Sequence, residues 1–336
     1  MKLRHFVQFT APSVALMLLL LALPLAVTLW LSLRTCVPEL ELVTVQQTGP
    51  FGAQTVLTQR ARLDAKGRVA EICQNGGLSM YRSVLGLAAA GTGGTPGAAT
   101  TSNPGETHNE FLAALGFTLA YTFITLPLVL LGGLLLALGI NRVATRWKGV
   151  FIAASLLPFI ITPVVGALAI KWLFRDDGLV PHLLAQVGVQ VFWMAQAWSA
   201  QLLIVLYGVW HVLPFAFIVL YAGLQSLSKD SVEAAQLDGA TRWQVMRFVT
   251  LPHLAPLMVF IALIHVMDAY RVFEPVLVLT QGAFTTSVQY LTYSVLLQEN
   301  NPYKASAAAV LTVLGIAVLL IPLLRRTWRE QRGGRA

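Results

Sequence analysis

Charged residues are scarce in this sequence: they make up 11% of its 336 residues, whereas 56% are hydrophobic. Soluble domains carry roughly 25% charged residues. This deficit excludes an ordinary soluble protein and predicts a chain that lies largely in a membrane. The formal net charge of +8 does not indicate a nucleic-acid partner, because many basic residues crowd into the C-terminal tail, after the last apolar segment. There they are typical of an orientation signal and of contact with anionic lipid headgroups.

The common catalytic motifs are also missing. No lysine follows a glycine, so the chain has no phosphate-binding Gly-Lys-Ser/Thr loop, and it contains neither His-Glu-x-x-His nor Gly-x-Ser-x-Gly. The sequence therefore predicts no ATP site of that type, no metal site and no enzymatic activity in this chain.

Cysteine is limited to Cys36 and Cys73, which are too few and too far apart for a metal site by spacing alone. Both fall in a hydrophilic segment after the first apolar run. If that segment faces an oxidising compartment, a disulfide between them can persist. Two free thiols remain the alternative, because pairing cannot be read from a sequence.

Six apolar segments reach the roughly 20 residues that a membrane-spanning helix needs. They cover residues 11–33, 111–140, 150–174, 200–224, 252–280 and 305–324. The first is too long for the apolar region of a signal peptide, so we expect a retained helix. The predicted fold class is an all-α polytopic membrane protein with six transmembrane helices.

The basic residues predict how these helices are oriented. An even number of spans places both termini on one side, and Lys and Arg concentrate at the N-terminus, in residues 141–149, in the polar loop 225–252 and in the tail 325–336. The positive-inside rule assigns these segments, and so both termini, to the cytoplasm.

The segment 34–110 is then an enlarged outer loop between the first two helices. Loops longer than about 60 residues escape the charge rule, so its own basic residues do not overturn the assignment. Residues 41–45 and 55–63 alternate as β-strands do, whereas residues 86–106 are rich in Gly, Ala, Thr, Pro and Ser and are expected to be flexible.

The polar loop carries two helix patterns in succession. Asp230 is the predicted N-cap of a first helix, with Glu233 at the capping-box position. Gly239 is the predicted left-handed stop. Thr241 opens a second helix, with Gln244 at its capping-box position. A loop that folds this tightly outside the bilayer predicts a partner to dock against.

The fifth apolar segment contains a group of ionisable residues. We expect Asp268–Arg271 and Arg271–Glu274, as i,i+3 pairs, to neutralise one another along one helix face near His265. One interpretation is a salt-bridge ladder that fixes helix packing. The other is a polar lining of a substrate path, since charges inside a span are costly and indicate function. The candidate path residues are Asp268, Tyr270, Arg271, Phe273 and Glu274.

The polar loop also supports a family resemblance. Glu233-Ala-Ala, then Gly239, then Val249-x-Leu251-Pro252 resembles the EAA motif of the permease subunits of ATP-binding-cassette (ABC) importers. Further runs, in matching order, resemble the maltose and sn-glycerol-phosphate type of carbohydrate permease: residues 109–119, 156–158, 209–215, 222–227, 238–240 and 268–274. The likeness covers roughly residues 109–324 and the first apolar segment. The turn Thr280-Gln-Gly-Ala-Phe284 and the size of the outer loop depart from the family pattern.

The resemblance implies a permease subunit for ATP-driven, binding-protein-dependent import of a sugar or related polyol, in a bacterial inner membrane. Its implied partners are a second, homologous permease subunit, two copies of a cytoplasmic ABC ATPase that binds ATP and Mg, and an extracytoplasmic solute-binding protein. The implied ATPase-coupling residues are Glu233, Ala234, Ala235, Asp238 and Gly239. No cofactor is expected in this chain itself.

The resulting division has four parts. Residues 1–33 are an N-terminal tail and the first helix, 34–110 the outer loop, 111–324 the core permease domain with its coupling loop 225–252, and 325–336 a basic cytoplasmic tail. Two alternatives stay open. One is an ion-coupled secondary transporter that uses Asp268 and Glu274. The other is a receptor or assembly protein whose outer loop binds a partner.

Overall fold

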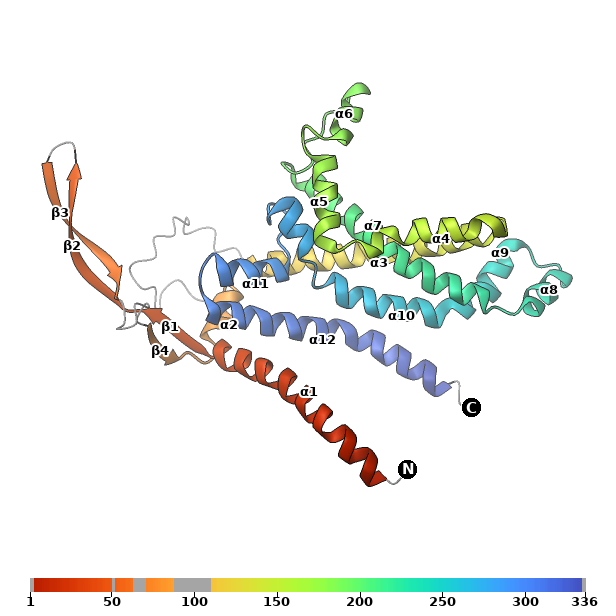
Figure 1. The fold of residues 1–336 in the computed structure, drawn as a ribbon, viewed down its shortest axis with the longest axis horizontal. Coiled ribbons are helices and arrows are strands. Elements are labelled where there is room, and N and C mark those ends of the chain that lie inside the picture. Colours follow the sequence, from red (N-terminus) through yellow and green to blue (C-terminus); the bar gives the residue numbers. More distant parts are fainter. Residues whose placement is uncertain (1–2, 50–51, 63–70, 88–109, 334–336) are drawn as a thin grey trace. The chain divides into compact units, whose positions relative to one another are not determined.

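The computed structural model describes residues 3–49, 52–62, 71–87 and 110–333, and most of them are helical (Figure 1). The chain forms two compact units. Unit one comprises Met1–Leu112 and Thr292–Leu311, and unit two comprises Ala113–Leu291 and Thr312–Ala336. The four-part division expected from the sequence stays a prediction.

Within the described residues, five helices are long and apolar enough to span a membrane, or six if one sharply bent pair counts as a single span. The helices are α1 (Leu3–Ser32), α2 (Ser79–Val84), α3 (Glu110–Asn141), α4 (Thr145–Ile160), α5 (Pro163–Phe174), α6 (Leu179–Gln186), α7 (Ala197–Gln225), α8 (Lys229–Leu237), α9 (Arg242–Val245), α10 (Leu251–Ala269), α11 (Val288–Leu297) and α12 (Pro302–Gly333), with π-helical turns η1 (Met246–Thr250) and η2 (Val276–Thr280). The predicted membrane class is confirmed. Because α12 runs to Gly333, most of the predicted tail continues the last helix.

The core of unit two lies where α3, α7 and α10 pack together (Figure 1). Val129, Phe217, Leu220, Leu254 and Ile261 are all buried in one cluster there. These helices are apolar on every side, as expected for helices whose other faces meet lipid rather than water.

The polar side chains of α3 are satisfied within their own helix. The hydroxyls of Thr118, Thr122 and Thr125 are buried, and each donates to the backbone carbonyl four residues earlier at 2.8 Å. This local bonding lets threonines lie in an apolar interior without an unpaired hydroxyl proton.

The span predicted over residues 150–174 is broken in the structure. α4 ends at Ile160, α5 begins at Pro163, and the two helices meet at 96°. Pro163 lacks the N–H that would continue α4, and a residue before proline avoids the helical region. Thr162 accordingly adopts φ −60° and ψ 143°. In Figure 1, α5 and α6 leave the bundle that α4 shares with α3, α7 and α10.

The span predicted over residues 252–280 also differs. It begins earlier, because α9, η1 and α10 form one helical rod of Arg242–Ala269, and it ends at Ala269. Irregular backbone follows, and the carbonyl of Val272 accepts a hydrogen bond of 2.6 Å from the buried hydroxyl of Ser287. Irregular backbone at membrane depth is tolerated where protein groups satisfy it in this way.

Unit one holds the outer loop. The strands are β1 (Arg34–Pro38), β2 (Leu40–Gly49), β3 (Gly52–Ala61) and β4 (Glu71–Asn75), paired antiparallel as β1–β4 and β2–β3. The expected strands are therefore present. Cys36 lies opposite Cys73 in the β1–β4 register, and the two form a disulfide. Most of the segment expected to be flexible, residues 86–106, lies outside the described residues.

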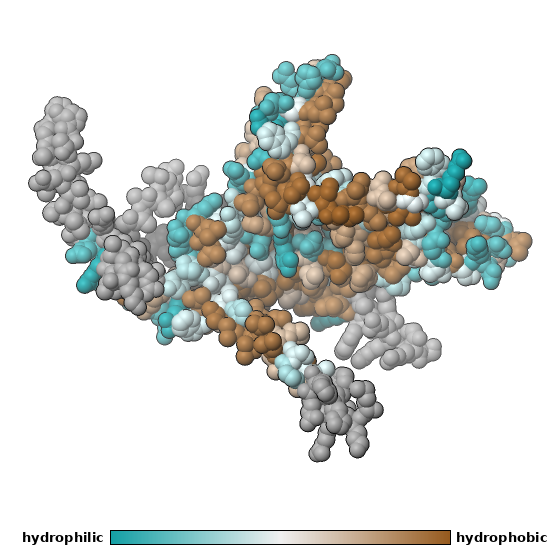
Figure 2. All heavy atoms as spheres, viewed as in Figure 1, coloured by the Kyte–Doolittle hydropathy of each residue, from teal (hydrophilic) through white to brown (hydrophobic). Residues whose placement is uncertain are grey.

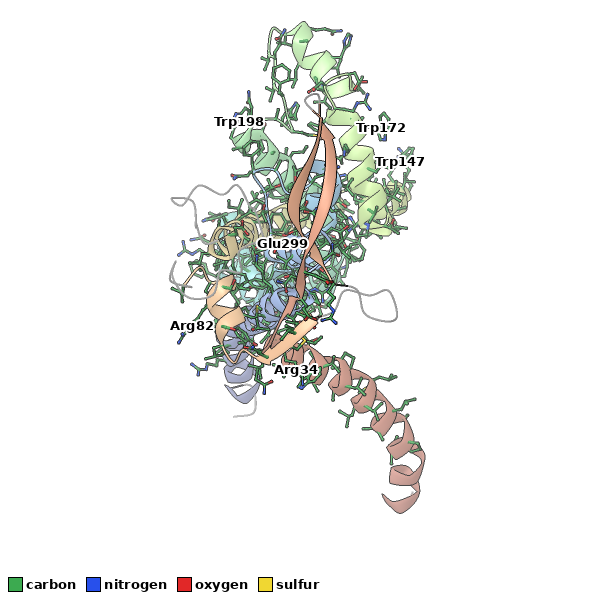
Figure 3. All side chains as sticks on the ribbon, turned by 90° about the vertical axis from the view of Figure 1, so that its left-hand side faces the viewer. Arg34, Arg82, Trp147, Trp172, Trp198 and Glu299 are labelled. Atoms are coloured by element: carbon green, nitrogen blue, oxygen red, sulfur yellow. A yellow bond between two sulfur atoms is a disulfide. The ribbon has the colours of Figure 1, made fainter. Side chains whose placement is uncertain are left out.

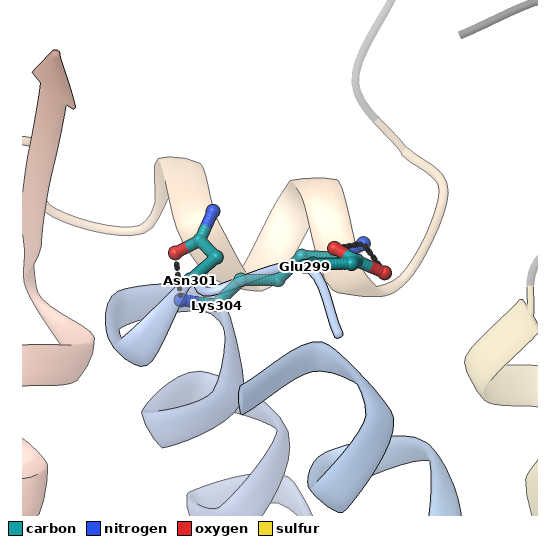
Figure 4. Close-up of polar contacts among 3 residues, drawn as sticks. All are labelled: Glu299, Asn301 and Lys304. Atoms are coloured by element: carbon teal, nitrogen blue, oxygen red, sulfur yellow. Dashed lines mark hydrogen bonds and ion pairs between the residues drawn. The ribbon is translucent and has the colours of Figure 1, made fainter. Parts of the chain in front are cut away.

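Hydrogen bonds and an ion pair order two further turns of unit one. The hydroxyls of Ser32 and Tyr81 lie 2.7 Å apart, which ties the end of α1 to α2. Figure 4 shows the turn before α12, where the backbone N–H of Lys304 donates to Asn301 Oδ1 at 2.9 Å and its ammonium group lies 2.9 Å from Glu299 Oε2. Asn301 thus acts as the N-cap of α12, as amide side chains do.

The surface of the helical region is apolar. Figure 2 shows hydrophobic residues over the helices of unit two and hydrophilic residues gathered at the end that carries α8 and α9. The side chains of Trp147, Trp172 and Trp198 point outward from α4, α5 and α7 and are more than half exposed (Figure 3). Exposed tryptophans of this kind are typical of a membrane–water interface.

Candidate functional site

Unit two contains two candidate functional sites. The first is the polar hairpin of α8 and α9. α8 begins after Ser228, whose hydroxyl accepts the backbone N–H of Ser231 at 3.3 Å. The prediction of Asp230 as N-cap is therefore wrong, because the helix starts two residues earlier than that pattern requires. Asp230 lies in the first turn instead, where its negative charge still favours the positive end of the helix dipole.

The turn between the two helices has the predicted left-handed glycine. Gly239 adopts φ +82°. Its N–H donates to the carbonyl of Gln236, and the N–H of Ala240 donates to the carbonyl of Ala235, both at 3.0 Å. This pair of bonds is the Schellman motif, which closes the C-terminus of a helix through a left-handed residue.

The second helix opens with the predicted capping box. Thr241 Oγ1 accepts the N–H of Gln244 at 3.3 Å, and Gln244 Oε1 accepts the N–H of Thr241 at 2.7 Å. Because α9 continues through η1 into α10, the hairpin is rigidly connected to a membrane-spanning helix.

The predicted coupling residues lie on the accessible surface of the hairpin. Glu233, Ala234, Asp238 and Gly239 are exposed, and Ala235 is half-buried. Sequence reasoning missed two apolar neighbours, since Leu237 is 89% and Trp243 69% exposed. Large apolar residues inside an otherwise polar loop are the pattern that could have identified them. Exposed apolar residues beside small and acidic ones are suited to contact another protein.

The second feature is a cavity of about 130 Å³ between α3, α5, α7 and α10. Its aromatic part is formed by Tyr121 and Tyr207. The hydroxyl of Tyr121 lies where a side chain at Gly208 would begin, so the close approach of α3 to α7 requires glycine there. His211 and Pro163 complete this side of the wall.

Charged side chains form another part of the wall. Asp268, Arg271 and Glu274 all line the cavity. The expected ion pairs among them are not formed in the described part of the chain, whose salt bridges join other residues. The reason is that α10 ends at Ala269, so the three side chains no longer share one helix face. Two carboxylates and one guanidinium therefore face the cavity without neutralising one another.

The two aromatic candidates lie elsewhere. Tyr270 is fully buried, and neither it nor the half-buried Phe273 is among the residues that line the cavity. Three of the five predicted path residues thus meet at one place with His265, together with Tyr121, Tyr207 and His211, which the linear sequence did not group with them.

His265 also lines the cavity. It is 1% exposed, and its Nε2 lies 2.9 Å from Thr125 Oγ1. Since the hydroxyl proton of Thr125 goes to the carbonyl of Tyr121, the Thr125 oxygen accepts from His265 Nε2–H. His265 Nδ1 is then an acceptor, and it has no partner among the described groups.

Comparisons with known proteins identify membrane components of transport systems. Residues 94–330 match the family described as the binding-protein-dependent transport system inner membrane component. A probable ABC transporter permease protein of Sinorhizobium fredii, y4oQ, is 32% identical over 67% of this chain and 73% of its own length. The trehalose transport system permease protein SugA of Mycobacterium tuberculosis is 32% identical over 66% of this chain and 71% of its own length.

A solved structure is also similar. It is that of a bacterial alginate ABC transporter in complex with alginate pentasaccharide-bound periplasmic protein. One of its chains aligns with a TM-score of 0.60 and 26% identity, over 66% of this chain and 79% of that chain.

Proposed function

Because this chain belongs to the family of inner membrane components of binding-protein-dependent transport systems, it is a transport subunit and not an enzyme, and we propose that its cargo is a di- or oligosaccharide or a related polyol. The names of its relatives support a carbohydrate: SugA belongs to a trehalose transport system, and the similar solved structure is that of an alginate transporter. The ABC relatives fit the ATP-driven importer and not the ion-coupled alternative.

The cavity is the proposed place where cargo passes. Tyrosine rings offer flat apolar faces to the C–H groups of a sugar, and the groups of Asp268, Arg271 and Glu274 accept and donate hydrogen bonds to hydroxyls. The cavity also lies beside two interrupted helices, since Pro163 begins α5 and Arg271 follows the end of α10. Interrupted helices are a common way to build a transport site at membrane depth.

The hairpin of α8 and α9 is the proposed contact with the ATPase. Glu233 would form a polar contact, Ala234 and Ala235 would allow close backbone approach, and Leu237 and Trp243 would supply apolar contact area. The rod from Arg242 to Ala269 supports this role, because its two ends are the hairpin and the residues beside the cavity. A displacement of the hairpin would therefore move Asp268 through a continuous helix.

The proposed assembly follows from the family. A second permease subunit would complete the pathway, two ATPase copies would hold ATP and Mg on the cytoplasmic side, and a solute-binding protein would deliver cargo from outside. The hairpin and both termini would lie in the cytoplasm, which the distribution of basic residues supports under the positive-inside rule. Coupling requires that the ATP-bound ATPase bind one conformation of the permease more tightly than the other.

Reconstitution tests the proposal. Proteoliposomes that contain this chain, its partner permease and the ATPase are supplied with the binding protein and a series of mono-, di- and oligosaccharides. We expect uptake of at least one saccharide that requires internal ATP and is indifferent to proton and sodium gradients. Uptake driven by an ion gradient without the ATPase would contradict the proposal, as would a binding protein that retains no saccharide in the series.

A further inference from the structure

The break between α4 and α5 leaves backbone carbonyls without their helical donors. In an unbroken helix the carbonyl of Pro158 would accept the N–H of Thr162, four residues later. Thr162 instead lies beyond the end of α4 in an extended conformation. An unpaired carbonyl in a membrane interior costs several kcal/mol, so another group must satisfy it.

Two side chains of α7 bind backbone carbonyls on the two sides of this break: the orphaned one of Pro158 before it and, after it, that of Pro163, the first residue of α5. His211 Nδ1 lies 2.9 Å from the carbonyl oxygen of Pro158, before the break, and must be the protonated nitrogen because a carbonyl only accepts. The hydroxyl of Tyr207 donates to the carbonyl of Pro163, after the break, at 2.7 Å. The break is thereby fastened to one neighbouring helix on both of its sides.

The two fastening residues also support each other. Tyr207 and His211 are one helical turn apart on α7, and their rings stack with centroids 5.7 Å apart and planes 8° from parallel. Tyr207 is buried and His211 half-buried. Both residues, and Pro163 with them, line the cavity described above. The contacts that set the bend are thus the same contacts that form one wall of the cavity.

We propose that Tyr207 and His211 are positioning residues: together they form a carbonyl latch that holds the bend between α4 and α5 and so sets the position of the Pro163 wall of the cavity. Without either hydrogen bond, the break is free to sample other angles, and the wall moves with it. The latch acts through the backbone and does not depend on which cargo is carried.

A distance measurement across the break tests the latch. Nitroxide labels are placed at Val150→Cys on α4 and Leu168→Cys on α5, which are 59% and 47% exposed. The native cysteines do not interfere, because Cys36 and Cys73 are both held in a disulfide. Pulsed electron paramagnetic resonance on the full-length chain in lipid nanodiscs should give one narrow distance distribution. Loss of one hydrogen bond should raise the population of other distances about 2- to 12-fold.

The variants separate hydrogen bonding from packing. Tyr207→Phe and His211→Phe keep an aromatic ring and lose the donor, so both should broaden the distribution. His211→Asn places an amide N–H close to the position of Nδ1 and should restore the narrow distribution, whereas His211→Gln places it one bond too far and should not. Broadening in His211→Asn equal to that in His211→Phe would overturn the proposal, as would wild-type distributions in both phenylalanine variants.

A second measurement connects the latch with the cavity. Val272 lines the cavity and is 7% exposed, so Val272→Cys without the nitroxide cysteines reports access to it. We expect its rate of maleimide labelling to change about 2- to 12-fold in Tyr207→Phe and His211→Phe and to return to the starting rate in His211→Asn. An unchanged rate in all three variants would refute the link between bend and cavity wall.

Discussion

Replacing Gly239 by valine should uncouple the hairpin from its partner without unfolding the membrane core. A side chain at this position would meet no atom within 4 Å, so steric collision contributes nothing. The cost arises from the backbone. The φ angle is +82°, and placing an L-residue with a side chain in the left-handed region costs about 1–2 kcal/mol of conformational energy. A loss of that size lowers the population of the native turn about 5- to 30-fold.

Asparagine is the matched control. Gly239→Asn also adds a side chain to the same open space, but asparagine tolerates the left-handed conformation through local hydrogen bonds. The assay is the ratio of cargo imported to ATP hydrolysed in proteoliposomes, with thermal unfolding of the purified chain measured alongside. We expect Gly239→Val to lower the ratio and leave the unfolding temperature of the core unchanged, whereas Gly239→Asn should stay close to wild type.

Two outcomes would refute this reasoning. If valine and asparagine impair coupling equally, the defect comes from the added side chain and not from backbone strain. If valine leaves coupling intact, the left-handed turn is not needed for the hairpin to dock. Either result would show that coupling does not depend on the left-handed backbone at Gly239.

The remaining predictions concern other parts of the molecule. Cys36→Ser should destabilise unit one by about 3–4 kcal/mol, since the disulfide with Cys73 closes a loop of 37 residues, and limited proteolysis with and without reductant checks this. Thr125→Val should lower the free energy of unfolding, measured by heat or denaturant, by about 1–3 kcal/mol, because it removes the acceptor of the buried His265 Nε2–H. Thr125→Ser retains the hydroxyl and should therefore keep most of the wild-type stability. Glu274→Gln should lower the rate of cargo uptake about tenfold or more while ATP hydrolysis continues, and an equal loss of both would point to a folding defect instead.

Local patterns predicted the hairpin well because its determinants are close in sequence. The Gly239 turn and the Thr241–Gln244 capping box depend on bonds between residues no more than five apart. The N-cap of α8 was the exception. Ser228 and Asp230 are both good capping residues, and the choice between them depends on where the preceding helix ends, which the local pattern does not state.

The ends of the helices inside the membrane were harder to predict. Hydropathy stays high past Ile160, and the charged residues around Ala269 are followed by a further apolar run, so hydropathy predicted single spans at both places. The breaks persist because distant residues satisfy the exposed carbonyls: Ser287 binds Val272, and His211 binds Pro158. Proline marked where a break was allowed, but only these tertiary partners made it stable.

By itself, the sequence determined the membrane class, the count and approximate places of the apolar segments, and the folded polar hairpin. These follow from the small charged fraction, from run lengths matched to bilayer thickness, and from caps made by near neighbours. Only the tertiary structure decided that Asp268, Arg271 and Glu274 leave one helix face and meet Tyr121, Tyr207 and His265 around a cavity. The physical reason is that the cavity is built from four helices far apart in the chain, and no spacing along the sequence encodes their contact.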